Sequence, residues 1–180
     1  MLTLKIEHDI DPQNPRTDFD NCGKMVCFHG RYTLGDAHDI DFRDFDGWED
    51  MRVHLIKDRD AVVILPLYLF DHSGITMSTS PFGCRWDSGQ VGFIVMDRET
   101  LLKEAPGHPK ILTSKAKAWA TQYLQSELRV YDHYLRGDVY GYIIEDEQGE
   151  TVEACWGFFG HNDCQKEGET VLASLQRKAA

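Results

Sequence analysis

Apolar and polar positions follow one another along the chain in two ways, one typical of strands and one typical of helices. Short apolar or alternating stretches bounded by Gly, Pro, Asp and Asn predict β-strands, because one or both faces of such a stretch can be buried in a sheet. These stretches are residues 2–8, 24–29, 61–70, 75–79, 90–96, 139–145 and 152–159. The last two flank a turn-forming segment and predict a hairpin. Pro66 interrupts the most apolar stretch, and because proline cannot donate to a sheet ladder, we expect a bulge or a sheet edge there.

Helical spacing of apolar and aromatic residues is clearest over residues 114–135, and Gly137 is well placed to end that helix. Residues 167–178 predict a weaker helix near the end of the sequence. Because terminal segments with few apolar contacts are often poorly ordered, we expect residues 165–180 to fray.

Two shorter helices are predicted between the strands. Asp46 and Glu49 have the spacing of a capping box, in which each side chain satisfies a free backbone amide, and the helix should run to about Asp58. Asp97 should cap a second short helix that ends near Glu104.

Strands therefore outnumber helices and do not alternate regularly with them, which favours the α+β class. We expect a mostly antiparallel sheet with one long amphipathic helix packed on a face and two or three short helices. Residues 1–180 are expected to form a single domain of ordinary size.

The charge of the chain restricts what it can bind. The 180 residues include 30 Asp and Glu against 19 Lys and Arg, a formal net charge of −11, and 42% are hydrophobic. The hydrophobic content predicts a packed core rather than a disordered acidic tail. The charge argues against direct nucleic-acid binding, because phosphates would be repelled over most of the surface. It is compatible with a protein that mimics DNA or that docks on a basic partner.

Neither the apolar runs nor the cysteines indicate export. The longest apolar run, residues 61–70, is well short of the ~20 residues that a membrane span needs, and the first eight residues do not resemble a signal peptide. Five cysteines at irregular spacing, with no C-x-x-C pair, fit reduced thiols better than a disulfide framework. We therefore expect a cytoplasmic protein with no membrane partner, located in the host cytoplasm if a phage encodes it.

Acidic side chains gather in two segments. The first segment holds Asp36, Asp39, Asp41, Asp44, Asp46, Glu49 and Asp50, and the second holds Glu145, Asp146, Glu147, Glu150 and Glu153. Such clusters can be solvated faces that aid solubility. They can also be docking surfaces, because long-range attraction speeds association with a basic partner. The sequence leaves both interpretations open.

A Gly-containing loop supplies a third candidate surface, with Arg85, Trp86 and Asp87 in succession. Trp and Arg contribute large contact energies when they are buried against a partner. Trp86 could equally be a core anchor, with Asp87 in an ordinary turn.

A catalytic alternative rests on the end of the central strand. Asp71 could orient His72, and Ser73 or Cys84 could act as a nucleophile. Neighbouring residues of an extended strand point to opposite faces, so this arrangement requires the chain to turn. A polar β-turn whose side chains satisfy backbone amides is the simpler interpretation.

A divalent metal is a second alternative. His29, Asp36, His38 and Asp39 follow a strand within eleven residues and offer nitrogen and oxygen ligands. Their spacing matches no established zinc or iron signature, and an acidic surface loop with ordinary histidines explains them equally well. The main hypothesis below needs no cofactor.

Three stretches of the sequence resemble a family of small proteins encoded by tailed phages and integrative mobile elements. They run from Asn21 to His29 and Arg31 to Asp36, from Ile64 to Ser78 and Trp86 to Ile94, and from Tyr131 to Tyr142 with Trp156 to Phe158. The resemblance implies no activity and no functional residues. It implies a context in which small acidic proteins are often accessory factors that block a host defence nuclease or DNA-binding complex.

The leading hypothesis is therefore a non-enzymatic accessory protein that binds and inhibits a host defence complex, of the anti-CRISPR or antirestriction type, through its acidic surfaces. Its partner would be a host protein or nucleoprotein complex with a basic surface. One alternative is a small hydrolase or metal-dependent enzyme that acts on a nucleotide-like small molecule through Asp71 and His72. Another is a phage structural or assembly component, which would form a defined homo-oligomer. The oligomeric state is left open.

Overall fold

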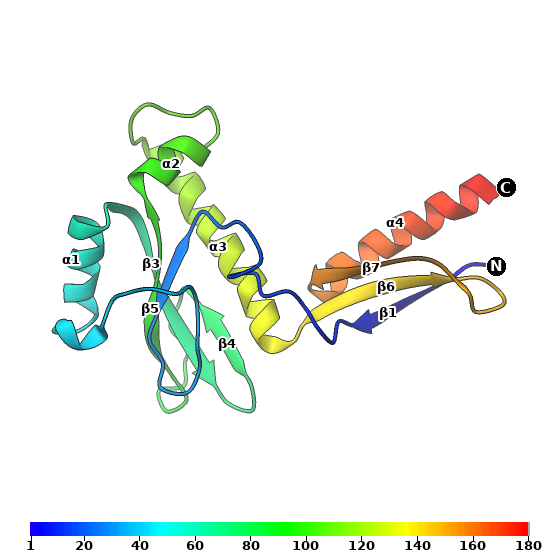
Figure 1. The fold of residues 1–180 in the computed structure, drawn as a ribbon, viewed down its shortest axis with the longest axis horizontal. Helices are drawn as coiled ribbons and strands as arrows, with labels where there is room; N and C mark the ends of the chain where they lie inside the picture. The colour runs from blue at the N-terminus through cyan, green and yellow to red at the C-terminus, as the bar shows by residue number, and fades with distance from the viewer. Residues whose placement is uncertain (180) are drawn as a thin grey trace. The chain divides into compact units, whose positions relative to one another are not determined.

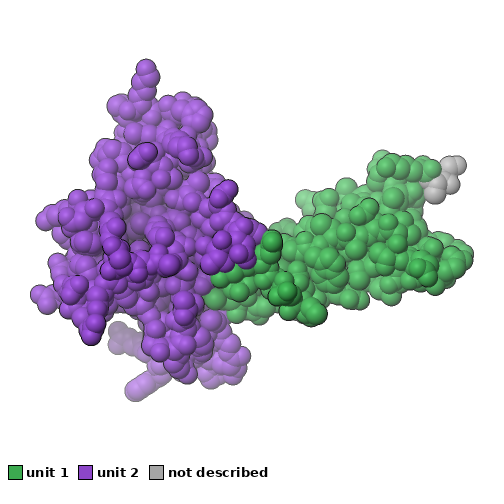
Figure 2. Space-filling model, viewed as in Figure 1, with its two compact units in different colours: residues 1–15, 133–180 green, residues 16–132 purple. Residues whose placement is uncertain are grey.

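A computed structural model describes residues 1–179, which form two compact units (Figures 1 and 2). Unit 1 combines residues 1–15 with the chain from residue 133 onward, and unit 2 comprises residues 16–132. The pattern along the sequence gives no sign of this division, because unit 1 is assembled from both ends of the chain. The predicted α+β class with antiparallel sheets is confirmed. In the described part of the chain, no helix has the length and apolar character of a membrane span.

Unit 2 is built on a four-stranded antiparallel sheet with the strand order β2-β5-β3-β4. These strands are β2 (Lys24–Cys27), β3 (Ala61–Asp71), β4 (Ile75–Ser78) and β5 (Ser88–Asp97), and the helical elements are η1 (Phe42–Asp44), α1 (Trp48–Asp58), α2 (Arg98–Glu104) and α3 (Ser114–Arg136). Helices α1 and α3 lie on opposite sides of the sheet (Figure 1).

Strand β5 forms the middle of the unit 2 core, and residues 91–96 of this strand are all buried. Phe93 and Val95 pack against Leu55 of α1. Ile94 alternates with them and faces the other side of the sheet, where α3 lies (Figure 1). Burial on both faces explains why the strand reads as an unbroken apolar run in the sequence.

Pro66 lies in the part of β3 that pairs with a neighbouring strand on one side only. Strand β4 pairs with Tyr68 to Asp71 of β3 and does not reach Pro66. Pro66 therefore has a ladder partner only in β5, opposite Phe93, and its missing N–H leaves no gap between two strands. The register shift in this ladder follows directly after, between Leu67 and Tyr68.

Unit 1 is a three-stranded antiparallel sheet covered on one face by a helix. Its elements are β1 (Thr3–His8), β6 (Val139–Glu145), β7 (Thr151–Phe159) and α4 (His161–Ala179), and β6 is the central strand. Tyr142 and Ile144 of β6 pack with Cys164 of α4 to form its core. The predicted hairpin of β6 and β7 is confirmed.

Helix α4 corrects the prediction of a single long helix. The sequence predicts a weak helix over 167–178 and fraying from residue 165, whereas the structure has a regular helix from His161 to Ala179; Ala180 lies outside the described residues. Glycine weakens intrinsic helix propensity, so Gly168 makes this helix look weak in the sequence, and the structure extends it back from residue 167 to His161. The same glycine lets the helix approach the sheet, because a Cβ atom there would lie 2.8 Å from Leu4 Cδ1.

The capping box expected at the start of α1 is wrong by one residue. The N-cap is Gly47, whose missing side chain gives no capping hydrogen bond. Asp50, not Glu49, reaches back, and it accepts a hydrogen bond from the backbone N–H of Asp46 at 3.2 Å. Glu49 instead pairs with Arg52 at 3.1 Å on the helix surface.

The expected start of α2 is confirmed. Asp97 is its N-cap, and a carboxylate oxygen accepts a hydrogen bond from the backbone N–H of Thr100 at 2.8 Å. This cap ends β5 and begins the helix at consecutive residues.

A buried ion-pair network holds the segment between β1 and β2 in place, and no pattern in the sequence predicts it. Arg16 of this segment is only 7% exposed. Its guanidinium donates to Asp36 Oδ2 at 2.7 Å, to Glu127 Oε2 at 3.0 Å and to the carbonyl of Gly23 at 2.6 Å. Burial alone would lower the pKa of Arg16, but its hydrogen bonds to Asp36 and Glu127 raise it. Asp36 also accepts from the backbone N–H of Met25 at 2.7 Å, so the network joins the loop, β2 and α3.

All five cysteines are free thiols, and their burial predicts very different reactivity. Burial raises the pKa of the Cys27 thiol to about 12, whereas Cys155 is exposed on β7. The thiolate is the reactive form, so at neutral pH a maleimide should label Cys155 quickly and leave Cys27 unlabelled in the folded chain. Mass spectrometry of labelled peptides measures this. Labelling of Cys27 at a rate similar to Cys155, without denaturant, would contradict the described core.

Candidate functional site

One end of the unit 2 sheet brings together segments that are far apart in the sequence. Because β5 runs antiparallel to β2 and β3, the segment after Cys27, the end of β3 and the loop before Ser88 meet at this end. A surface cleft of about 430 Å³ lies between them. We call this surface the Trp86 end and define it by His29, Arg31, Asp71, Trp86 and Asp87, all of which line the cleft.

Asp71 is held by the segment after β2 and not by its neighbour His72. Its carboxylate pairs with the guanidinium of Arg31 and accepts a hydrogen bond from the Tyr32 hydroxyl at 3.2 Å. The ring of His29 stacks on Tyr32 with centroids 4.9 Å apart, and Arg31 Cζ lies 5.5 Å from the same ring centroid. Neither Arg31 nor Tyr32 was predicted as a partner of Asp71. Arg31 and Tyr32 follow β2, and Asp71 ends β3. Only the knowledge that β2 and β3 both pair with β5 could have suggested that these residues meet.

The side chains of the catalytic alternative do not form a chain of contacts from Asp71 to Ser73. His72 Nδ1 and Cys84 Sγ each lie 3.4 Å from Asp87 Oδ2, so both contact the same carboxylate oxygen. Ser73 lies in a turn with φ of 57°, where the backbone N–H of His72 donates to the carbonyl of Gly74. The polar-turn interpretation therefore describes residues 72–74, and the carboxylate that contacts His72 is that of Asp87 rather than the predicted Asp71.

Trp86 is not a core anchor, because its side chain is 96% exposed. The loop that carries it is nevertheless braced on both sides of the tryptophan. Ser88 Oγ donates to the carbonyl of Cys84, and the backbone N–H of Asp71 donates to the carbonyl of Asp87 at 2.8 Å. A large aromatic side chain is thus held in water on a fixed loop, with the exposed Arg85 beside it.

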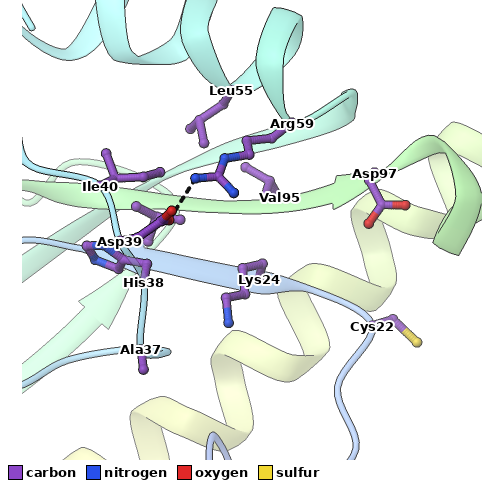
Figure 3. Close-up of a pocket in the computed structure, with 11 residues that line it drawn as sticks. Cys22, Lys24, Ala37, His38, Asp39, Ile40, Leu55, Arg59, Val95 and Asp97 are labelled. Atoms are coloured by element: carbon purple, nitrogen blue, oxygen red, sulfur yellow. Dashed lines mark hydrogen bonds and ion pairs between the residues drawn. The ribbon is translucent and has the colours of Figure 1, made fainter.

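A second hollow, of about 510 Å³, lies on the α1 side of the sheet next to β2 (Figure 3). Its apolar part is formed by Val26, Leu55 and Val95, which belong to the core. Lys24 and Arg59 bring positive charge to it, but Arg59 already pairs with Asp39 at 2.7 Å (Figure 3). The hollow can accommodate a small molecule with an apolar body, and no described contact selects a particular one.

The four residues of the metal alternative have separate partners. Asp36 is taken up by the Arg16 network, and Asp39 pairs with Arg59. His38 Nε2 lies 3.0 Å from the carbonyl oxygen of Cys27, and His29 Nδ1 accepts from the backbone N–H of Arg31 at 3.3 Å. Within residues 1–179, no three His, Cys, Asp or Glu side chains are arranged to hold a metal ion.

The first acidic segment is partly neutralised by arginines, of which only Arg43 lies within it in the sequence. Asp36 is buried with Arg16, Asp39 pairs with Arg59, Asp41 pairs with Arg43 at 2.6 Å, and Glu49 pairs with Arg52. The pKa of Asp39 is lowered by a hydrogen bond from its own backbone amide and by the pairing with Arg59. The pKa of Asp41 is lowered to about 2 by hydrogen bonds from the side chain and backbone of Arg43. Asp44, Asp46 and Asp50 remain on the surface of η1 and the start of α1. This segment therefore presents less net charge than its sequence suggests.

The second acidic segment keeps more of its charge. Glu145 pairs with Lys5 at 2.6 Å, and Asp146 Oδ1 accepts from two backbone amides of the turn at 2.9 Å. Glu150 and Glu153 have no ion-pair partner among the described residues, and Glu147 pairs only with the amino group of Met1. Residues 1–15 and 133–180 hold 12 Asp and Glu against 5 Lys and Arg, a net charge of −7 out of −11. The excess negative charge thus belongs mainly to unit 1.

No family model, curated protein or solved structure matches the chain.

Proposed function

We propose that this chain is a non-enzymatic binding protein that docks on a host complex with a basic surface and inhibits it, as anti-CRISPR and antirestriction proteins do. The Trp86 end makes the contact, and the acidic hairpin turn of unit 1 supplies long-range attraction. The observation that carries the proposal is the exposure of Trp86, which is 96%, on a braced loop.

The exposed tryptophan supports a protein partner, because exposing so large an apolar side chain to water is unfavourable in free energy. Burying an aromatic side chain of this size against a partner is strongly favourable, and tryptophan and arginine dominate the binding energy of protein interfaces. Trp86 has Arg85 beside it and the Arg31–Asp71 pair across the cleft. The loop needs no reordering to bind, so little conformational entropy is lost on association.

The charge distribution supports a partner that is basic. The carboxylates of Glu147 and Glu150 sit at the exposed turn of the hairpin, and acids exceed bases in unit 1 by 12 to 5. A surface of this sign attracts Lys and Arg patches of the kind that hold phosphate, and it raises the rate of encounter. Charges at an exposed turn are screened by salt, so the attraction weakens as ionic strength rises.

Capture of partners from a bacterial lysate tests the electrostatic part of the proposal. The wild-type chain should retain a host protein or nucleoprotein at low salt and lose most of it at high salt. The double variant Glu147→Lys and Glu150→Lys should lose it already at low salt, because it reverses two charges of the exposed turn, of which only Glu147 has a partner, the amino group of Met1. Asp41→Lys is the matched control, since Asp41 is already paired with Arg43. Equal capture by both variants and by the wild type would contradict a role for the acidic turn.

A further inference from the structure

Strand β7 is the least covered strand of the fold. Residues 151–157 are all exposed, and only Phe158 of this strand joins the unit 1 core. The core under α4 is otherwise built from β1 and β6, with Leu4, Tyr142 and Ile144 among its members. Helix α4 therefore packs mainly on β1 and β6, and residues 151–157 of β7 stay exposed, with no strand paired along their outer edge.

Along the outer edges of the unit 2 sheet, side chains and loops make hydrogen bonds to backbone groups of the edge strands. The outer edge of β7 differs in this respect. Along β4, Asp132 Oδ1 accepts from the backbone N–H of Met77 at 2.7 Å and from the Thr76 hydroxyl at 2.6 Å. Along β2, the carbonyl of Met25 accepts from the backbone N–H of Asp36 at 2.9 Å. No described hydrogen bond closes the outer edge of β7 between residues 151 and 157, and this stretch contains neither lysine nor proline. Open edges of this kind pair with other strands unless such residues block them.

The exposed apolar side chains of β7 are arranged symmetrically about Ala154. Val152 is 44% exposed and Trp156 is 45% exposed, two positions before and two after it. The two register shifts of the β6–β7 ladder fall near the same two positions, so residues 153–155 form the regular part of the strand. Trp156 lies across Gly141 of β6, where a Cβ atom would meet its ring at 2.2 Å, and this contact holds the ring over the neighbouring strand while nearly half of the residue stays exposed.

We propose that β7 pairs antiparallel with β7 of a second copy of this chain, with Ala154 opposite Ala154 at the twofold axis. This register sets Val152 opposite Trp156 of the second copy, a β-branched and aromatic pair of the kind that stabilises antiparallel sheets. The small side chains at the axis let the two strands approach. Glu153 faces Cys155 of the second copy, so no two acids lie opposite each other.

Beyond the strand, the same register brings the acidic turn of one copy near a helix start of the other copy whose first turn already holds an acid, Asp163. The acidic turn 146–150 of one copy comes to the end of the other copy's β7, which leads directly into α4 at His161. The free amides of the first turn of a helix of this length carry partial positive charge, which favours nearby carboxylates. Each copy nevertheless carries a net charge of −11. Added salt screens that overall repulsion, so the dimer should strengthen or hold as salt rises, opposite to the behaviour expected of the host complex.

Light scattering on the purified protein, at low and high salt, tests the proposal by measuring its mass in solution. The wild type should have twice the mass of the chain at micromolar concentration. Ala154→Lys places two like charges directly opposite each other at the axis and should weaken the dimer by about tenfold or more. Thr3→Lys, on the other edge strand of the same sheet, should leave it intact. A monomeric wild type, or a dimer that Ala154→Lys does not weaken, would overturn the proposal.

Cross-linking checks the register directly. In a chain carrying Cys22→Ser and Cys84→Ser, Cys155 is the only exposed cysteine of the described residues. The two Cys155 residues would be diagonal neighbours across the axis, about 7–8 Å apart. A short bismaleimide should therefore join two chains through Cys155, and Cys155→Ser should abolish the product without dissociating the dimer. A dimer with no such product would refute this register. None of these outcomes depends on a host partner, so they separate this proposal from the proposed function.

Discussion

Replacing Arg16 with alanine is expected to destabilise unit 2 by about 3–5 kcal/mol, because it leaves the carboxylates of Asp36 and Glu127 buried without their counter-charge. Loss of this size is a large share of the stability of an ordinary domain. Urea unfolding followed by circular dichroism measures it as a fall in the transition midpoint. Arg16→Lys should fall between the wild type and Arg16→Ala, since lysine restores the charge but not the forked geometry that reaches both Asp36 oxygens.

The matched control for Arg16 is an arginine in an ion pair on the surface. Arg43 pairs with Asp41, and the Arg43 side chain is largely in water. Exposed pairs contribute little, so Arg43→Ala should unfold at nearly the same urea concentration as the wild type. If the two alanine variants unfold at the same urea concentration, the buried network does not hold the loop, β2 and α3 together as described.

The second large effect is expected at Gly92, where β5 and β2 approach most closely. A Cβ atom on Gly92 would lie 2.0 Å from the carbonyl oxygen of Val26 and 2.9 Å from Cys27 Cα, both backbone atoms of the neighbouring strand. Backbone cannot give way as a side chain can, so Gly92→Ala must displace β2. We expect a loss of about 3 kcal/mol, at the upper end of the range for overpacked cores.

Gly89 provides the control for this prediction within the same strand. A Cβ atom there meets nothing within 4 Å, so Gly89→Ala should change the free energy of unfolding by about 0.5 kcal/mol or less. Thermal unfolding of the two variants side by side gives the comparison. Equal stability of Gly92→Ala and the wild type would show that β2 does not lie against β5 at Val26.

The elements of the fold could be predicted from the sequence where local pattern decides the outcome. The strand around Pro66 and the helix from residue 114 have strong periodicity, and Asp97 has the local chemistry of a helix cap. Prediction was partial at α4, where a weak helix over 167–178 was expected and the structure has a regular helix from His161 that packs on Leu4. The start of α1 was missed by one residue because glycine, with no side-chain signal, is its N-cap.

The candidate site could be predicted less well, because it depends on contacts between distant residues. Asp71 and Arg31 are 40 residues apart, and Arg16 and Glu127 are 111 apart. The sequence identified Trp86 as a candidate but could not separate a core anchor from an exposed contact residue. That difference is set by how the loop before β5 leaves the sheet. The acidic segment 36–50 appears in the sequence as a charge cluster opposed only by Arg43, since Arg16, Arg52 and Arg59 lie outside it.

The effect of Trp86→Ala on capture of a partner from a bacterial lysate tests the central claim most directly. Ile111→Ala is the matched control, because Ile111 is also a large hydrophobic residue of unit 2 and is 71% exposed. Truncating a tryptophan at the centre of an interface costs about 2 kcal/mol or more, which corresponds to roughly a thirtyfold loss of affinity. The account predicts that Trp86→Ala no longer retains the partner at low salt while Ile111→Ala retains it as the wild type does. Retention by Trp86→Ala at the wild-type level would contradict the account.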